Sequence, residues 1–260
     1  MNSVEEKIET GPDPKDFVSL HGGSIAKKLV PDLTDNHMSV SVLARSSLST
    51  TLKFSYAGVV RVVKHFHVDD RKARACYLRE RDALRVHAQS GLVPTLEFFS
   101  DEAGFLAVEH IDGENVRDVI DQQSLDYMCF AIGKWLGKFA NAAPSKQVSG
   151  NWEQYLHNYA ELNNSLSVSS SSDFLREFTY DKVVLSKNDG ALSNLMIARD
   201  GKLFGVDFEN SQFKPFGWDL LLTARALVRL FPSETSLCIA ELVNGFCKAT
   251  GANSEKYRTF

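Results

Sequence analysis

Apolar and polar positions form short, regular patterns along much of the chain between residues 38 and 110. Apolar and polar residues alternate at 38–44 and 52–56, and apolar residues dominate the short segments 59–66, 96–100 and 105–110. Short segments of both kinds are typical of β-strands. Between the third and fourth segments, residues 69–89 place apolar side chains at every third or fourth position and stop before Gly91, which indicates an amphipathic helix. The pattern predicts a five-stranded antiparallel sheet with one helix inserted after its third strand.

The second half of the chain follows a helical period. Apolar stripes at this spacing predict helices over 125–141, 151–162, 218–230 and 234–250. A strand that ends near Ser186 and a hairpin that turns at Asp200-Gly201 interrupt the helical pattern, and the Asn- and Ser-rich residues 163–173 predict a surface loop. We therefore expect an α+β fold of two lobes, divided into a leader (1–37, in which 16–29 can form a short helix), an N-lobe (38–111) and a C-lobe (112–260).

Composition and charge exclude some classes of function. The chain has 260 residues with 43% hydrophobic and 24% charged residues, an ordinary balance for a globular protein. Its net charge of −4 gives no bulk attraction to nucleic acid or anionic membranes, and no apolar run approaches the ~18 residues of a spanning helix. We predict no nucleic-acid partner and no membrane insertion, and the sequence does not indicate an oligomeric state.

The four cysteines show no C-x-x-C pairing and no spacing typical of a metal site; they are Cys76, Cys129, Cys238 and Cys247. We expect reduced, mostly buried thiols, as in cytoplasmic proteins.

Three polar residues stand around the predicted hairpin at a distinctive spacing. Asp189 and Asn194 are five residues apart, and Asp207 follows Asn194 by thirteen, at the end of the hairpin's return strand. With Glu209 and with Asp219 in the segment Gly-Trp-Asp-Leu, this order resembles the catalytic and metal-binding segments of the protein-kinase-like superfamily. The chain is most similar to the aminoglycoside phosphotransferase and choline kinase branch, over roughly residues 38 to 245.

The resemblance implies a role for each of these side chains. Asp189 would accept the proton of the attacking hydroxyl, while Asn194 and Asp207 would bind Mg²⁺ beside the nucleotide phosphates. Glu209 would reach a second metal or a bound water, or would act only as a hydrogen-bonding neighbour. Asp219 would support the backbone of the catalytic loop.

The resemblance also implies an ATP site in the first half of the chain. Lys64 would neutralise the α- and β-phosphates, and Glu80 would pair with Lys64, although a solvated charged face remains an alternative for Glu80. The backbone groups of Glu109 and Ile111 would bind the adenine edge.

Two positions depart from the family pattern. The loop of residues 44–51 lacks glycine, so the amides and hydroxyls of Ser46, Ser47 and Ser49 would bind the phosphates instead. Lys187 replaces the usual histidine of the catalytic loop, and its ammonium would either point at the γ-phosphate or be solvated.

The resemblance therefore implies an ATP- and Mg²⁺-dependent phosphotransferase. Its acceptor would be a hydroxyl of a small molecule such as a sugar, an amino alcohol, an aminoglycoside-like compound or a glycan end. Only residues 208–218 separate the metal-binding aspartate from Asp219, which favours a small acceptor over a protein substrate. The alternative is a pseudokinase, or a regulatory module that binds nucleotide or a partner protein without turnover.

Overall fold

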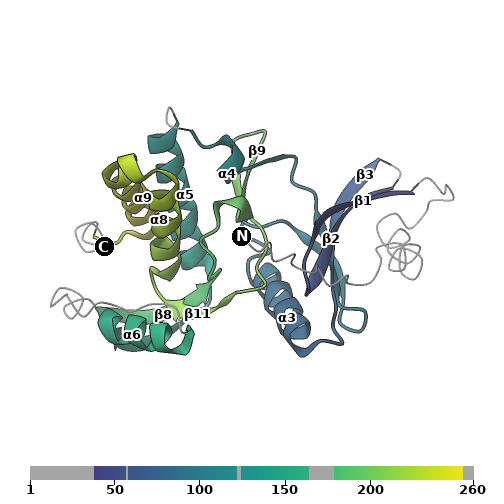
Figure 1. The fold of residues 1–260 in the computed structure, drawn as a ribbon, viewed down its shortest axis with the longest axis horizontal. Coiled ribbons are helices and arrows are strands. Elements are labelled where there is room, and N and C mark those ends of the chain that lie inside the picture. Colours follow the sequence, from purple (N-terminus) through teal and green to yellow (C-terminus); the bar gives the residue numbers. More distant parts are fainter. Residues whose placement is uncertain (1–37, 57, 122–123, 164–178, 254–260) are drawn as a thin grey trace, which may run out of the picture. The chain divides into compact units, whose positions relative to one another are not determined.

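A computed structural model describes residues 38–56, 58–121, 124–163 and 179–253 (Figure 1). The short helix expected at 16–29 and nearly all of the loop expected at 163–173 lie outside these residues. The chain divides into two compact units, which we call unit 1 (residues 1–115 and 195–210) and unit 2 (residues 116–194 and 211–260). No helix in the described ranges combines the length and the apolar character needed to cross a bilayer.

Unit 1 contains the predicted five-stranded antiparallel sheet. The strands lie in the order β1-β2-β3-β5-β4. Their bounds are β1 (Met38–Arg45), β2 (Ser49–Tyr56), β3 (Val59–Phe66), β4 (Leu96–Ser100) and β5 (Phe105–Glu109). Because alternate residues share one face of a strand, the apolar positions gather into one core, in which Leu52, Phe54 and Val63 are at most 1% exposed. The expected sheet is confirmed.

Helix α3 (Arg71–Val86) is the helix inserted after the third strand. The Asp70 side chain caps its first turn by accepting a hydrogen bond from the Ala73 N–H at 2.8 Å. Tyr77 packs edge-on against Phe66 of β3, with ring centroids 5.8 Å apart. The face of α3 that buries Tyr77 also buries Glu80, one turn further on.

A second, three-stranded sheet in unit 1 was not expected in full. Its order is β10-β9-β6, and its strands are β6 (Gly113–Asn115), β9 (Leu195–Ala198) and β10 (Leu203–Gly205). β9 and β10 form the predicted hairpin, whose turn is closed by the Lys202 N–H donating to the Asp200 side chain at 2.9 Å. A Cβ at Gly113 would lie 2.1 Å from the Ile197 carbonyl oxygen, so glycine allows β6 to approach β9.

Unit 2 is mainly helical. The three long helices that the sequence predicts, α5 (Leu125–Ala142), α8 (Trp218–Leu230) and α9 (Thr235–Thr250), lie side by side in Figure 1. α6 (Trp152–Asn163) lies next to a sheet of order β11-β8-β7, built from β7 (Ser145–Asn151), β8 (Thr179–Ser186) and β11 (Gln212–Pro215). The described residues of unit 2 also form the one-turn helix α4 (Val116–Val119) and two short 3-10 turns, Leu192–Asn194 and Pro232–Glu234. Of these strands, the sequence predicts β8 but neither β7 nor β11.

Candidate active site

In unit 1, three carboxylates converge on the ammonium of Lys64. Lys64 Nζ lies 2.8 Å from Glu80 Oε2, 2.6 Å from Asp207 Oδ1 and 3.0 Å from Glu209 Oε2. Lys64 comes from β3 and Glu80 from the buried face of α3, while Asp207 and Glu209 follow β10. We call these four residues the Lys64 cluster. Glu80 is only 6% exposed, which excludes the solvated charged face.

The charges of the Lys64 cluster are unbalanced. Burial raises the pKa of the Glu80 carboxyl, and Lys64 opposes that rise. Burial by itself would lower the pKa of the Lys64 ammonium, but Glu80, Asp207 and Glu209 together hold that pKa above its usual value. The carboxylate oxygens of Glu80, Asp207 and Glu209 lie within 4.8 Å of one another, and oxygen donors of this kind are the ligands preferred by Mg²⁺. The Lys64 cluster therefore has the chemistry of a site for a divalent cation and phosphate.

The backbone around Asp207 is held in an unusual conformation. Asp207 has φ of 61°, in the left-handed region that few residues other than glycine adopt. Arg79 Nε donates a 2.6 Å hydrogen bond to the carbonyl oxygen of Glu209, and this contact ties the segment to α3. Arg79 was not among the site residues expected from the sequence. Its position directly before the predicted partner of Lys64 was the available signal.

In unit 2, Asp189 accepts hydrogen bonds on both carboxylate oxygens. Oδ1 accepts from the Ala191 N–H at 2.8 Å, and Oδ2 accepts from the Asn194 side-chain amide and from Lys187 Nζ at 3.2 Å. Burial by itself would raise the pKa of Asp189, but the Lys187 ammonium and these donors hold it below its usual value. Asp189 is therefore a fixed carboxylate that stays ionised, as required of a proton acceptor at neutral pH.

Asp219, in the first turn of α8, supports the loop that carries Asp189. Its carboxylate accepts from the Ser186 hydroxyl at 2.7 Å, from the Lys187 N–H at 3.0 Å and from the Asn188 N–H at 2.8 Å. Burial raises the pKa of Asp219, and the three donors oppose that rise. The expected hydrogen bonds from Asp219 to the backbone of the loop that carries Asp189 are present, whereas the contact with Ser186 was not anticipated.

The residues on either side of Asp189 lock the loop in place. Asn188 has φ of 57°, and its side-chain oxygen accepts a 2.7 Å hydrogen bond from the Trp218 indole N–H. A Cβ at Gly190 would lie 2.4 Å from the Leu222 carbonyl oxygen, so only glycine permits this approach to α8. The sequence analysis quoted Trp218 beside Asp219 without giving it a function. Together these contacts orient Asp189 from within unit 2.

Lys187 is buried. It is 2% exposed, and its ammonium pairs with Asp189, which excludes the solvated alternative for this side chain. Since the pair lies within the loop, the structure shows Lys187 as the counter-charge of the proposed proton acceptor.

The serine loop between β1 and β2 forms a tight turn of its own. The Ser46 hydroxyl accepts from the N–H groups of Leu48 and Ser49 at 3.2 and 3.0 Å, and the Ser46 N–H donates to the Ser49 carbonyl at 2.9 Å. Ser49 is 6% exposed, while Ser47 is exposed. Ser46 is exposed as well, so Ser46 and Ser47 are the accessible serines of this turn.

The expected adenine-binding segment follows β5. The Glu109 N–H donates to the Thr95 carbonyl at 3.0 Å, and Ile111 is 8% exposed. The roles of the Glu109 and Ile111 backbone groups remain predictions.

The predicted residues thus gather in two groups. Unit 1 brings together Lys64, Glu80, Asp207 and Glu209, and unit 2 brings together Lys187, Asp189 and Asn194.

No protein-family model and no curated protein sequence matches this chain. Solved structures do match its fold. An ethanolamine kinase from Plasmodium vivax is 11% identical with a TM-score of 0.60, over 97% of this chain and 78% of that one. A choline kinase from Cryptosporidium parvum is 14% identical with a TM-score of 0.58, over 91% and 80%.

The ternary complex of streptomycin, ATP and APH(2")-IIa is 16% identical with a TM-score of 0.51, over 91% of this chain and 88% of that one. Similarity at such low identity concerns the fold. With the order of strands and helices described above, it shows that this chain has the protein-kinase-like fold in the form shared by aminoglycoside phosphotransferases and choline and ethanolamine kinases.

Proposed function

We propose that this protein is an ATP- and Mg²⁺-dependent phosphotransferase that moves the γ-phosphate of ATP to a hydroxyl of a small molecule. The observation that carries the proposal is the Lys64 cluster, in which one ammonium faces three carboxylates. Such an excess of negative charge suits a divalent cation, and the ammonium suits phosphate oxygens. The solved structures of similar fold support small molecules as acceptors, since their names give ethanolamine, choline and streptomycin.

Each residue of the Lys64 cluster has a proposed task. Asp207 and Glu209 would hold Mg²⁺, with the Asn194 carboxamide as a further ligand, and bound Mg²⁺ would neutralise charge on the β- and γ-phosphates. Lys64, oriented by Glu80, would bind the α- and β-phosphates.

The remaining nucleotide contacts are proposed from position. The turn containing Ser46, Ser47 and Ser49 would contact the phosphates, chiefly through Ser47, because Ser46 is exposed too but its hydroxyl already accepts from Leu48 and Ser49. The backbone groups of Glu109 and Ile111 would bind adenine.

Asp189 would carry the acid–base step. The acceptor oxygen forms a bond to the γ-phosphorus, the bond from that phosphorus to the bridging oxygen breaks, and its electron pair leaves with ADP. The hydroxyl proton passes to the Asp189 carboxylate, which Lys187 keeps ionised. The pairing of Lys187 with Asp189 supports this task for Lys187 ahead of direct contact with the γ-phosphate.

The first test separates the two aspartates. Asp207→Ala removes a metal ligand, so calorimetry should show weaker Mg-ATP binding, whereas Asp189→Ala should bind Mg-ATP as the parent protein does. In an ATP-consumption screen with hydroxylated metabolites, Asp189→Ala should lower turnover by about 10² to 10⁴-fold, the usual scale for a positioned general base. Equal loss of nucleotide binding in both variants would refute the assigned roles.

A second candidate is a nucleotide-binding pseudokinase. The observation that favours it is the serine turn. The Ser46 hydroxyl already accepts hydrogen bonds from the N–H groups of Leu48 and Ser49, so these N–H groups are engaged and cannot donate to the phosphates. This candidate predicts Mg-ATP binding without transfer to any acceptor. It would be supported if Asp189→Ala left the slow background hydrolysis of ATP unchanged.

We also propose a cytoplasmic location. The four cysteines expected to be reduced are buried and form no disulfide in the described part of the chain, as is usual for proteins of that compartment.

A further inference from the structure

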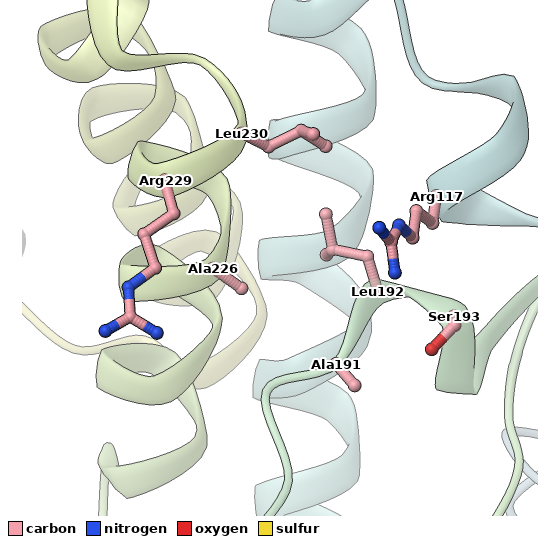
Figure 2. A pocket seen from close by; sticks show the side chains of 7 residues that line it. All are labelled: Arg117, Ala191, Leu192, Ser193, Ala226, Arg229 and Leu230. Atoms are coloured by element: carbon pink, nitrogen blue, oxygen red, sulfur yellow. The ribbon is translucent and has the colours of Figure 1, made fainter. Parts of the chain in front are cut away.

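A cavity of about 310 Å³ lies in unit 2 beside the loop that carries Asp189 (Figure 2). Two arginines line it, Arg117 and Arg229, and both are exposed. Figure 2 shows the Arg229 guanidinium directed away from Arg117 and Leu192, so the two charges do not face one ligand. The cavity therefore does not indicate the charge of an acceptor.

Arg79 of α3, in unit 1, is held between two defined partners. Its Nε donates to the Glu209 carbonyl oxygen at 2.6 Å, and a terminal nitrogen of its guanidinium donates to Cys76 Sγ at 3.2 Å. Cys76 lies one turn earlier in the same helix and is only 2% exposed, so this contact fixes the direction of the guanidinium. Arg79 therefore presents its Nε–H to a backbone atom of the segment that follows β10.

That segment contains a strained residue. Asp207 has φ of 61°, and the ring of Phe208 is fully buried. With that ring buried, the flanking carboxylates of Asp207 and Glu209 converge on Lys64. A backbone conformation of this kind persists only where surrounding contacts hold it, and the buried ring and the Arg79 hydrogen bond are two such contacts.

Asp207 and Glu209 are the accessible carboxylates of the Lys64 cluster. Their side chains are 36% and 20% exposed, whereas those of Lys64 and Glu80 are 12% and 8% exposed. Both accessible carboxylates now accept from Lys64 Nζ, at 2.6 and 3.0 Å. Because two positive charges on the same carboxylates repel each other, Lys64 must release them when they bind a divalent cation, and the nucleotide phosphates are its proposed new partners.

We propose that the Arg79 hydrogen bond survives this exchange and makes Arg79 a positioning residue for the divalent cation. The bond ends on the backbone carbonyl of Glu209 and leaves the carboxylate oxygens open to the cation. It holds the Glu209 carboxylate beside that of Asp207 after Lys64 has moved to the phosphates. The inference rests on the proposed phosphotransferase function, since it assigns a residue to metal binding in that reaction.

Three variants and two binding measurements test this role. Arg79→Met keeps most of the side-chain length and removes the donor, while Arg79→Lys keeps the positive charge. Arg71→Gln is the matched control, because Arg71 is an exposed arginine of the same helix. Electron paramagnetic resonance measures the free Mn²⁺ in a titration without nucleotide, and calorimetry measures ATP binding once with Mg²⁺ and once with EDTA.

The expected losses are specific to the metal. Arg79→Met should weaken the binding of Mn²⁺ and of Mg-ATP by about tenfold each, the scale of one hydrogen bond from a charged donor, and should change ATP binding in EDTA by less than about twofold. Arg79→Lys should lie between Arg79→Met and the parent protein, and Arg71→Gln should match the parent. A purely electrostatic role predicts the opposite sign, because removal of a positive charge would tighten the binding of a cation.

Unchanged or tighter metal binding in Arg79→Met would overturn the proposal. Equal loss of ATP affinity with and without Mg²⁺ would overturn it too, because such a loss indicates general damage to the fold. A measurement on the parent protein decides the matter if Arg79→Met does not fold. The Arg79 Nε–H signal, followed by ¹⁵N NMR, should stay protected from solvent exchange when Mg-ATP binds, and loss of that protection would refute the positioning role.

The same measurements separate this role from the proposed function. If Mg-ATP and Mn²⁺ bind equally to the parent protein and to Arg79→Met, the positioning role is refuted and the phosphotransferase stands. If Mn²⁺ binding depends on Arg79 and ATP binds neither with nor without Mg²⁺, the phosphotransferase is refuted and the positioning role stands.

Discussion

Replacing Asp219 by alanine tests how the structure supports the catalytic loop. The Asp219 carboxylate is buried and accepts from the Ser186 hydroxyl and from the N–H groups of Lys187 and Asn188. In Asp219→Ala all three donors lose their acceptor at once. Two of the donors belong to the backbone directly before Asp189, so the variant should loosen the loop as well as destabilise the fold.

The cost can be worked out from these contacts. A hydrogen bond to a charged acceptor contributes about 1.5–3 kcal/mol, so three such bonds could contribute roughly 4.5–9 kcal/mol. Part of that loss is offset, because burial raises the pKa of Asp219 and its removal relieves the cost of a buried charge. We expect the free energy of unfolding to fall by about 3–5 kcal/mol, a large part of the roughly 5–15 kcal/mol typical of a domain.

Chemical denaturation followed by tryptophan fluorescence measures this change, since Trp218 lies next to Asp219. Ser186→Ala is the graded control, because it removes one donor and keeps the two backbone contacts, and it should cost about 1 kcal/mol. Asp219→Asn keeps the shape and one acceptor oxygen and should fall between the two. A cost below about 1 kcal/mol for Asp219→Ala would refute the claim that this carboxylate supports the loop.

Three further predictions follow from buried groups and close packing. Burial lowers the pKa of His87 to about 4. Between about pH 6.5 and pH 4, His87 is therefore protonated in the unfolded chain but neutral in the folded protein. The free energy of unfolding should therefore fall by about 3 kcal/mol between pH 6.5 and pH 4, a loss that denaturation of His87→Leu should not show. In Gly133→Ala the new methyl group would lie 1.9 Å from the Leu242 carbonyl oxygen, so α5 and α9 must move apart. Thermal unfolding should show that the free energy of unfolding falls by about 1–3 kcal/mol, and an unchanged melting temperature would contradict this close packing. In Lys187→Met the pKa of Asp189 should rise because its counter-charge is gone, and an NMR titration of the Asp189 carboxyl carbon that shows no rise would remove Lys187 from the mechanism.

Sequence patterns predicted the larger elements because their signals are local. The first two strands of the five-stranded sheet alternate apolar and polar residues, the other three are short apolar-rich segments, and α3, α5, α8 and α9 repeat an apolar stripe, so neighbouring residues carry the information. The strands β6, β7 and β11 carry no such signal. β6 is three residues long, and β7 is polar and largely exposed. These strands exist because β8 and β9 offer hydrogen-bonding partners from distant parts of the chain.

The candidate site divides in the same way. The spacing of Asp189, Asn194 and Asp207 is visible in the sequence, because the three residues lie at the ends of predicted strands and the short connections between those strands set the number of residues between them. The pairing of Lys64 with Glu80 was inferred from resemblance, and the structure places the two in contact. The burial of Lys187 could not be read from the sequence, since a lysine in a loop is usually solvated.

The sequence by itself determined the order of the larger elements, the spacing of Asp189, Asn194 and Asp207 and the resemblance to a phosphotransferase fold. Only the tertiary structure decided which of the many charged residues face one another. Arg79 and Glu209 are far apart in the chain and share a hydrogen bond, while Lys64 gathers three carboxylates from other elements. Periodicity reports which face of an element is apolar, but the charge of a pocket depends on contacts between distant elements, and no local pattern encodes those contacts.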